Sequence, residues 1–121
     1  MGINQRDVYL LPHPINPKSE ENHPFIVISV ESSNSHENTF LAVMITASKK
    51  TIDDHSFQLT DDMFEYPLRK TDCHARMHLI MLCLPKEIIG NKLNTMKEFY
   101  FKQLMKYIGD IVFNYDFTPL D

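Results

Sequence analysis

The chain has 121 residues, of which 43% are hydrophobic and 23% are charged, and it carries a net charge of −4. These values describe one globular domain with its own core and argue against a disordered chain. The acidic balance argues against a general nucleic-acid binder. No apolar run is long enough to span a membrane and the start lacks a signal-peptide core, so we expect a cytoplasmic protein without a membrane partner.

The first part of the chain reads as three strands. Residues 7–11 form a short apolar run, and the prolines within residues 12–22 exclude both a helix and a central strand, which makes this segment a loop. Residues 25–30 and 40–46 are nearly continuous in β-branched and apolar residues, as strands covered on both faces are. The polar segment between them, residues 31–38, shows no helical pattern and is expected to be a loop.

The middle of the chain alternates short apolar runs with polar turns. Residues 56–59 alternate as a half-buried strand does, and residues 60–64 suit a single helical turn capped by Thr60. Residues 68–84 predict one or two strands, with the second half buried. Pro85 ends this stretch, and residues 86–90 read as a turn or short helix.

The clearest helix covers residues 95–108. Thr95 and Glu98 form a capping-box pattern, an apolar face follows the helical period, and Gly109 supplies a stop. Residues 110–121 contain no basic residue and read as a last strand or as an extension packed on the body or on a second subunit. We therefore expect one mainly β domain over residues 1–121, a small barrel with a late helix packed on it.

Two polar residues mark the ends of the central strands. If the second and third strands pair antiparallel, the start of one lies beside the end of the other, and His23 meets Thr46 at one end of the sheet. Both residues also suit a purely structural role, His23 as a polar residue opening a strand and Thr46 as a β-branched strand residue. The sequence alone leaves both readings open.

The remaining polar groups give weaker signals. The spacing of Cys73 and Cys83 suits neither a zinc site nor a disulfide framework, and the three glycines form no phosphate loop, so we expect reduced thiols and no metal or cofactor. The basic residues form a patch if their segments are neighbours in the fold, and are otherwise separate solvated charges. They are Lys49, Lys50, Arg69, Lys70 and Arg76.

The order of these strands resembles the PemK/MazF-like family of toxins from type II toxin–antitoxin systems. Residues 6–10, R-D-V-Y-L, resemble the opening family strand G-D-[IV]-[YW]-L. Residues 23–29, H-P-F-I-V-I-S, resemble the strand R-P-[AV]-[LIV]-[VI]-[LI]-S, and residues 44–48, M-I-T-A-S, resemble a strand ending in threonine. A late capped helix completes the resemblance, which covers roughly residues 7–109.

The resemblance implies an SH3-like barrel that forms a homodimer, cleaves single-stranded RNA without a metal and is neutralised by an antitoxin. In that reaction the ribose 2′-hydroxyl attacks the adjacent phosphate. Thr46 matches the catalytic threonine of the family, whereas His23 stands where the family has its catalytic arginine, and Arg6 replaces the opening glycine. The apolar runs 77–84 and 111–117 exceed the needs of one small barrel, which also favours a dimer.

The replacement of the arginine by His23 leaves two functional predictions open. Histidine can transfer a proton but supplies no permanent charge, so His23 would need help from Lys18, Lys49 or Arg76. Ser19 and Ser48 complete the predicted substrate-binding set. We favour a toxin endoribonuclease; the alternative is a toxin-like barrel that has lost cleavage and binds protein or nucleic acid.

Overall fold

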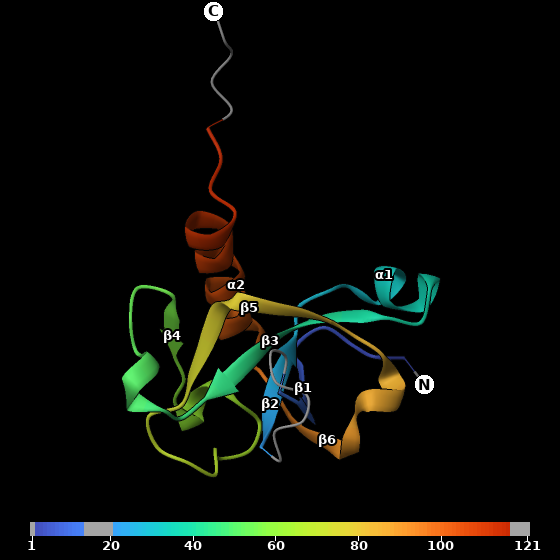
Figure 1. Ribbon diagram of the computed structural model, residues 1–121, viewed down its shortest axis with the longest axis horizontal. Helices are drawn as coiled ribbons and strands as arrows, with labels where there is room; N and C mark the ends of the chain where they lie inside the picture. The colour runs from blue at the N-terminus through green and yellow to red at the C-terminus, as the bar shows by residue number, and fades with distance from the viewer. Residues whose placement is uncertain (1, 14–20, 117–121) are drawn as a thin grey trace, which may run out of the picture.

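The computed structural model describes residues 2–13 and 21–116 (Figure 1). Its strands and helices follow one another along the chain with short connections. In chain order they are β1 (Asp7–Pro12), β2 (Asn22–Val27), α1 (Glu31–His36), β3 (Phe40–Thr46), η1 (Lys49–Thr51), β4 (Ser56–Gln58), η2 (Asp61–Met63), β5 (His74–Cys83), η3 (Pro85–Glu87), β6 (Ile89–Thr95), α2 (Glu98–Tyr107) and the π-helical turn η4 (Ile108–Val112).

The strands form one antiparallel sheet in the order β4-β5-β3-β2-β1-β6. The sheet curls back on itself, because the segment after β4 meets the end of β6. Phe64 bridges to Met96, the Glu65 N–H donates to the Thr95 carbonyl at 3.1 Å, and the Lys97 N–H donates to the Met63 carbonyl at 2.8 Å. The expected mainly β fold with a C-terminal helix is confirmed, and this closure gives it the form of a small barrel.

Apolar residues fill both faces of the central strands, as their continuous apolar runs predict. Ile26 and Val43 belong to one buried cluster, to which α2 contributes Phe101 and Leu104. Their neighbours Phe25 and Ala42 belong to a second cluster on the opposite face. Full burial of one large apolar side chain contributes roughly 1.5–3 kcal/mol. The two clusters therefore fix which residues of β2 and β3 face each side.

The polar segment between β2 and β3 was expected to be a loop, and that prediction is wrong. It contains α1, which depends on the buried Asn34. The Asn34 side-chain amide donates to the carbonyls of Ile3 at 2.8 Å and Ser29 at 3.1 Å, and its oxygen accepts from the Ser29 hydroxyl. Contacts to residues outside the helix stabilise it, so its own sequence shows no helical period.

The start of the late helix also differs from the prediction. Residues 89–95 continue the sheet as β6, and α2 begins only at Glu98. The Thr95 hydroxyl donates to the buried Asp7 carboxylate at 3.1 Å and therefore forms no capping box. Gly109 does not stop the helix, because the π-helical turn η4 continues to Val112.

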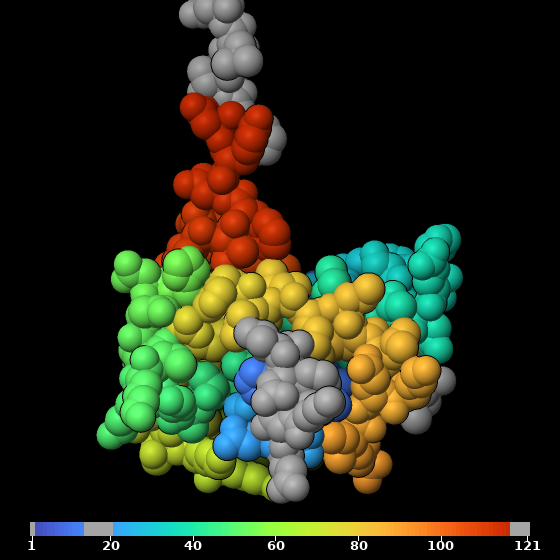
Figure 2. All heavy atoms as spheres, in the orientation of Figure 1, coloured from blue at the N-terminus to red at the C-terminus, as the bar shows by residue number. Residues whose placement is uncertain are grey.

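The chain beyond η4 forms no strand over residues 113–116, and residues 117–121 lie outside the described residues. Figure 2 shows the end of α2 and η4 protruding from the body formed by the strands. Cys73 and Cys83 are both buried free thiols. Within the described ranges, no helix combines the length and the hydropathy that a membrane crossing needs.

Replacing Asn34 by alanine should destabilise the protein. The change leaves the Ile3 and Ser29 carbonyls without their side-chain donor, and losing such buried hydrogen bonds typically costs about 1–3 kcal/mol. Chemical denaturation followed by circular dichroism measures the free energy of unfolding. Ser35→Ala on the same helix is the matched control, because Ser35 is exposed. Equal stability of the two variants would contradict the role given to Asn34.

Candidate functional site

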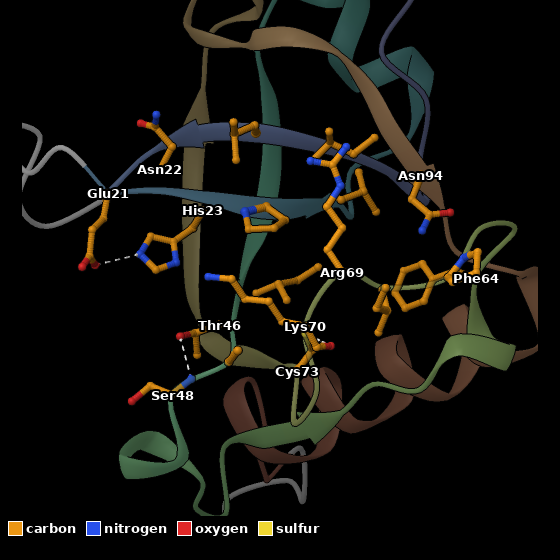
Figure 3. A pocket seen from close by; sticks show the side chains of 18 residues that line it. Glu21, Asn22, His23, Thr46, Ser48, Phe64, Arg69, Lys70, Cys73 and Asn94 are labelled. Carbon is orange, nitrogen blue, oxygen red and sulfur yellow. Dashed lines mark hydrogen bonds and ion pairs between the residues drawn. The ribbon is translucent and has the colours of Figure 1, made fainter.

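A pocket of about 690 Å³ opens where the start of β2 and the end of β3 meet the segment that leads into β5 (Figure 3). Strands β1 and β6 and the residues around Pro67 supply its apolar lining. Part of its polar lining lies where the two central strands meet, and Asn94 of β6 lies on the opposite side in Figure 3. The polar lining residues are Glu21, Asn22, His23, Thr46, Ser48, Arg69, Lys70 and Asn94.

The register of the two central strands brings His23 and Thr46 together. Phe25 pairs with Met44 and Val27 with Ala42, so the same antiparallel register places His23 opposite Thr46. Both side chains line the pocket, as Figure 3 shows. The two residues therefore lie at one end of the sheet, which is the arrangement that antiparallel pairing implies.

His23 is largely enclosed, with a side chain that is 17% exposed. Its Nε2 atom is buried and makes no hydrogen bond to the described residues, because the nearest carboxylate oxygen, on Glu21, is 3.9 Å away. The His13 ring lies edge-on to it, with 5.3 Å between ring centroids.

The surroundings of His23 lower its pKa. Burial is the main cause, and His13 and the charge of Lys70 act in the same direction. The Ile45 carbonyl and the Glu21 carboxylate favour the protonated form and offset part of this effect. Since an ordinary histidine titrates near 6.5, His23 is predominantly neutral at pH 7 and can accept a proton.

Thr46 is half-buried, and its hydroxyl oxygen accepts the Ser48 N–H at 3.3 Å. The hydroxyl hydrogen donates to none of the described residues, so it can donate to an anionic ligand in the pocket. Ser48 lines the same part of the pocket. This end of β3 thus offers two hydroxyl groups next to a neutral imidazole.

Two of the other predicted binding residues, Arg76 and Lys49, lie outside the pocket. The Arg76 guanidinium is buried and donates to Asp53 at 2.8 and 3.2 Å, to Ser56 Oγ at 3.0 Å and to the Thr51 carbonyl. Lys49 pairs with Asp72 at 3.6 Å. Neither side chain lines the pocket. Lys18 and Ser19 fall outside the described residues.

Two cations of the pocket, Arg69 and Lys70, were absent from the predicted substrate-binding set. Both are exposed, and neither forms an ion pair within the described part of the chain. The sequence signal for them was the set of basic residues considered as a local patch. That patch is divided in the structure, because Arg76 faces Asp53 and Lys70 faces the pocket.

A metal centre finds no support in residues 2–13 and 21–116, where no group of three or more histidine, cysteine or acidic side chains is arranged to bind an ion. The chemistry that the pocket itself offers is proton transfer by His23, hydrogen-bond donation by Thr46 and positive charge from Arg69 and Lys70. This combination suits a phosphodiester, which carries a negative charge.

Replacing Asp53 by asparagine should destabilise the protein in a pH-dependent way. Hydrogen bonds from Arg76 are the main reason why the pKa of Asp53 falls to about 2. An unfolded aspartate titrates near 3.9, so the stabilisation is present above that pH and is lost as the pH falls through about 2. We expect Asp53→Asn to lower Tm at pH 7, and the difference from wild type to shrink between about pH 4 and pH 2.

Thermal unfolding over a series of pH values measures this difference. Asp54→Asn is the control, because Asp54 is exposed and forms no ion pair with any described residue. A Tm difference for Asp53→Asn that stays constant with pH would contradict the assigned role.

Comparison with known proteins finds a matching family and solved structures with a similar fold. The model of the PemK-like, MazF-like toxin family of type II toxin–antitoxin systems matches residues 4–112. An endoribonuclease in complex with its cognate antitoxin from a mycobacterial species has a TM-score of 0.69 and 14% identity, over 91% of this chain and 94% of that chain. MazF from Deinococcus radiodurans has a TM-score of 0.69 and 9% identity, over 94% of this chain and 99% of that chain.

A third structure, the Mycobacterium tuberculosis toxin MazF-mt6, has a TM-score of 0.65 and 12% identity, over 93% of this chain and 100% of that chain. The comparison with curated proteins gave no match. At these identities the solved structures establish the fold alone, whereas the family match extends from before β1 to the end of η4. The chain therefore belongs to the PemK-like, MazF-like family of toxins from type II toxin–antitoxin systems.

Proposed function

We propose that this protein is a toxin endoribonuclease that cleaves single-stranded RNA without a metal ion and is neutralised by an antitoxin protein. The observation that carries the proposal is that His23 and Thr46 line one pocket, at positions that the continued register of β2 and β3 places opposite each other. Family membership supports it, and two of the similar structures are named as endoribonucleases. We place its action in the cytoplasm, where such a toxin meets RNA.

In this mechanism the neutral His23 accepts the proton of a ribose 2′-hydroxyl. The 2′-oxygen attacks the adjacent phosphorus, the bond from phosphorus to the 5′-oxygen breaks, and the departing oxygen takes up a proton from water. The proton on His23 is then released to solvent. The products are a 2′,3′-cyclic phosphate and a 5′-hydroxyl. Thr46 donates a hydrogen bond to a phosphate oxygen, with Ser48 as a second donor. The Glu21 side chain, which is exposed, moves away from His23 as the RNA binds.

We also propose that the protein acts as a homodimer. Leu82 on β5 is 66% exposed and Phe113 after η4 is 63% exposed, and both belong to apolar runs that a single barrel leaves partly uncovered. A second copy or an antitoxin would cover these side chains. The structural likeness to a toxin bound to its antitoxin supports a protein partner of this kind.

The catalytic assignment predicts that His23→Ala lowers the cleavage rate by roughly 10²–10⁴-fold, the usual contribution of a positioned acid–base group. Thr46→Ala should lower it as well, because the phosphate loses a hydrogen-bond donor. The measurement is cleavage of a long single-stranded RNA with a chelator present. His36→Ala is the matched control, because His36 is exposed on α1 and does not line the pocket.

Cleavage that survives both pocket substitutions would remove His23 and Thr46 from the mechanism. If the wild-type protein itself cleaves no RNA, the nuclease proposal fails. The binding module that has lost cleavage then becomes the favoured function.

The dimer proposal predicts that light scattering gives twice the mass of one chain at micromolar concentration. Leu82→Lys should shift the protein towards the monomer, because it places a charge within the apolar surface of β5. Ile52→Lys is the control, since Ile52 is a similarly exposed apolar residue in another part of the chain. A single-chain mass at all concentrations would contradict the dimer.

A further inference from the structure

The proposed reaction requires a positive charge in the pocket that neither His23 nor Thr46 supplies. A phosphodiester is negatively charged, and negative charge on its oxygens develops further as the 2′-oxygen attacks. His23 cannot balance this charge while it serves as the base, because a base must be neutral before it accepts the proton. Thr46 donates a hydrogen bond but carries no charge. A cation from another part of the chain has to supply the rest.

Several of the described cations form ion pairs away from the pocket. Arg76 is buried against Asp53, and Lys49 pairs with Asp72 at 3.6 Å. Lys92 lies 3.6 Å from Asp7, while Lys102 and Lys106 pair with acidic residues one turn away on the C-terminal helices. Of the cations that the structure describes, only Arg69 and Lys70 line the pocket.

The geometry distinguishes the two. In Figure 3 the Lys70 side chain extends towards the space between His23 and Thr46, whereas the Arg69 side chain runs away from Thr46 across the strands. The main influences on the pKa of His23 agree with this arrangement. The charge of Lys70 is one of them, and the charge of Arg69 is not among them. Among the described cations, Lys70 is therefore the one directed towards the place where the proposed chemistry happens.

The backbone around Lys70 is held on both sides. The Cys73 thiol donates to the Lys70 carbonyl at 3.2 Å, and the Cys73 carbonyl accepts the Leu59 N–H at 2.9 Å. On the other side, the Leu68 N–H donates to the Asp61 carboxylate at 3.0 Å. The main chain is thus fixed next to the pocket while the amino group stays exposed to solvent, as a group that must reach a ligand needs to be.

We propose that Lys70 binds the scissile phosphate and neutralises the charge that develops on it, while His23 transfers the proton. This inference rests on the proposed RNA cleavage. Lys70 reaches a non-bridging phosphate oxygen with its amino group. The lysine charge also lowers the pKa of the neighbouring imidazole, a shift of which burial is the main cause. The groups that face His23 shift its pKa in opposite directions. Lys70 and His13 favour the neutral ring, and Glu21 and the Ile45 carbonyl favour the protonated ring.

The first test compares Lys70→Gln and Lys70→Arg with wild type in single-turnover cleavage of a single-stranded RNA, with a chelator present. Lys70→Gln should lower the rate by roughly 10²–10³-fold, as the loss of one group that stabilises a developing oxyanion does. Lys70→Arg should recover most of the rate, because it keeps the charge. Lys86→Gln is the matched control, since Lys86 is exposed and lies outside the pocket. A wild-type rate for Lys70→Gln would overturn the proposal.

The second test does not depend on cleavage. Titration of His23 by NMR should give a higher pKa in Lys70→Gln than in wild type, because a positive charge that favours the neutral ring has been removed. Lys70→Arg and Lys86→Gln should leave the pKa of His23 close to that of wild type. A purely structural role of Lys70 would not produce this pattern, and an unchanged pKa in Lys70→Gln would contradict it.

The third test uses an oligonucleotide whose 2′-hydroxyl groups are replaced by hydrogen, which binds without being cleaved. Lys70→Gln should reduce the slope of log K against log salt by about 0.7, the value for one phosphate contact in a single strand. If wild type binds but does not cleave RNA, the proposed function fails while this slope still decides whether Lys70 contacts phosphate. An unchanged slope would overturn the inference in either case.

Discussion

The antiparallel register of β2 and β3 is the constraint on which the pocket depends. A shift of one residue would turn every side chain of β2 to the opposite face and move His23 away from Thr46. The apolar residues on both faces prevent that shift, because Ile26 and Phe25 would exchange two differently shaped environments. Because both faces are buried, the cost of such a shift is the cavities and overpacked contacts that it would create, typically about 1–3 kcal/mol for each misfitted side chain. Core packing therefore positions the proposed catalytic pair.

The enclosed histidine changes how the site can work. An arginine in this position would bring charge and donors together, whereas His23 brings a proton acceptor whose neutral form is favoured by its burial. In the proposed mechanism, proton transfer and charge stabilisation come from different segments. The base is on β2 and the cation is on the segment before β5. Glu21 and Lys70 act on the pKa of His23 in opposite directions, and burial of the ring is the larger influence.

The sequence predicted the elements whose signal is local and missed those that depend on distant contacts. The strands around Phe25 and Val43 were found from their continuous apolar residues, and antiparallel pairing alone brought His23 to Thr46. Strand β6 was missed because five of its seven residues are exposed, and α1 because the contacts of Asn34 hold it. Lys70 and Arg76 look alike in the sequence. Only the bend of the chain between β4 and β5 buries one of them against Asp53 and turns the other to the pocket.

The overall charge gives the pocket cations particular weight. With a net charge of −4, the protein does not attract RNA from a distance, and at physiological salt screening removes most interactions beyond about 8 Å. Binding therefore has to come from contacts made at short range. Ion pairs hold Arg76 and Lys49 within the protein, and of the described cations only Arg69 and Lys70 line the pocket. If the protein binds RNA as proposed, its affinity would depend on a small number of local contacts, and each phosphate contact would have a measurable share in the salt dependence of binding.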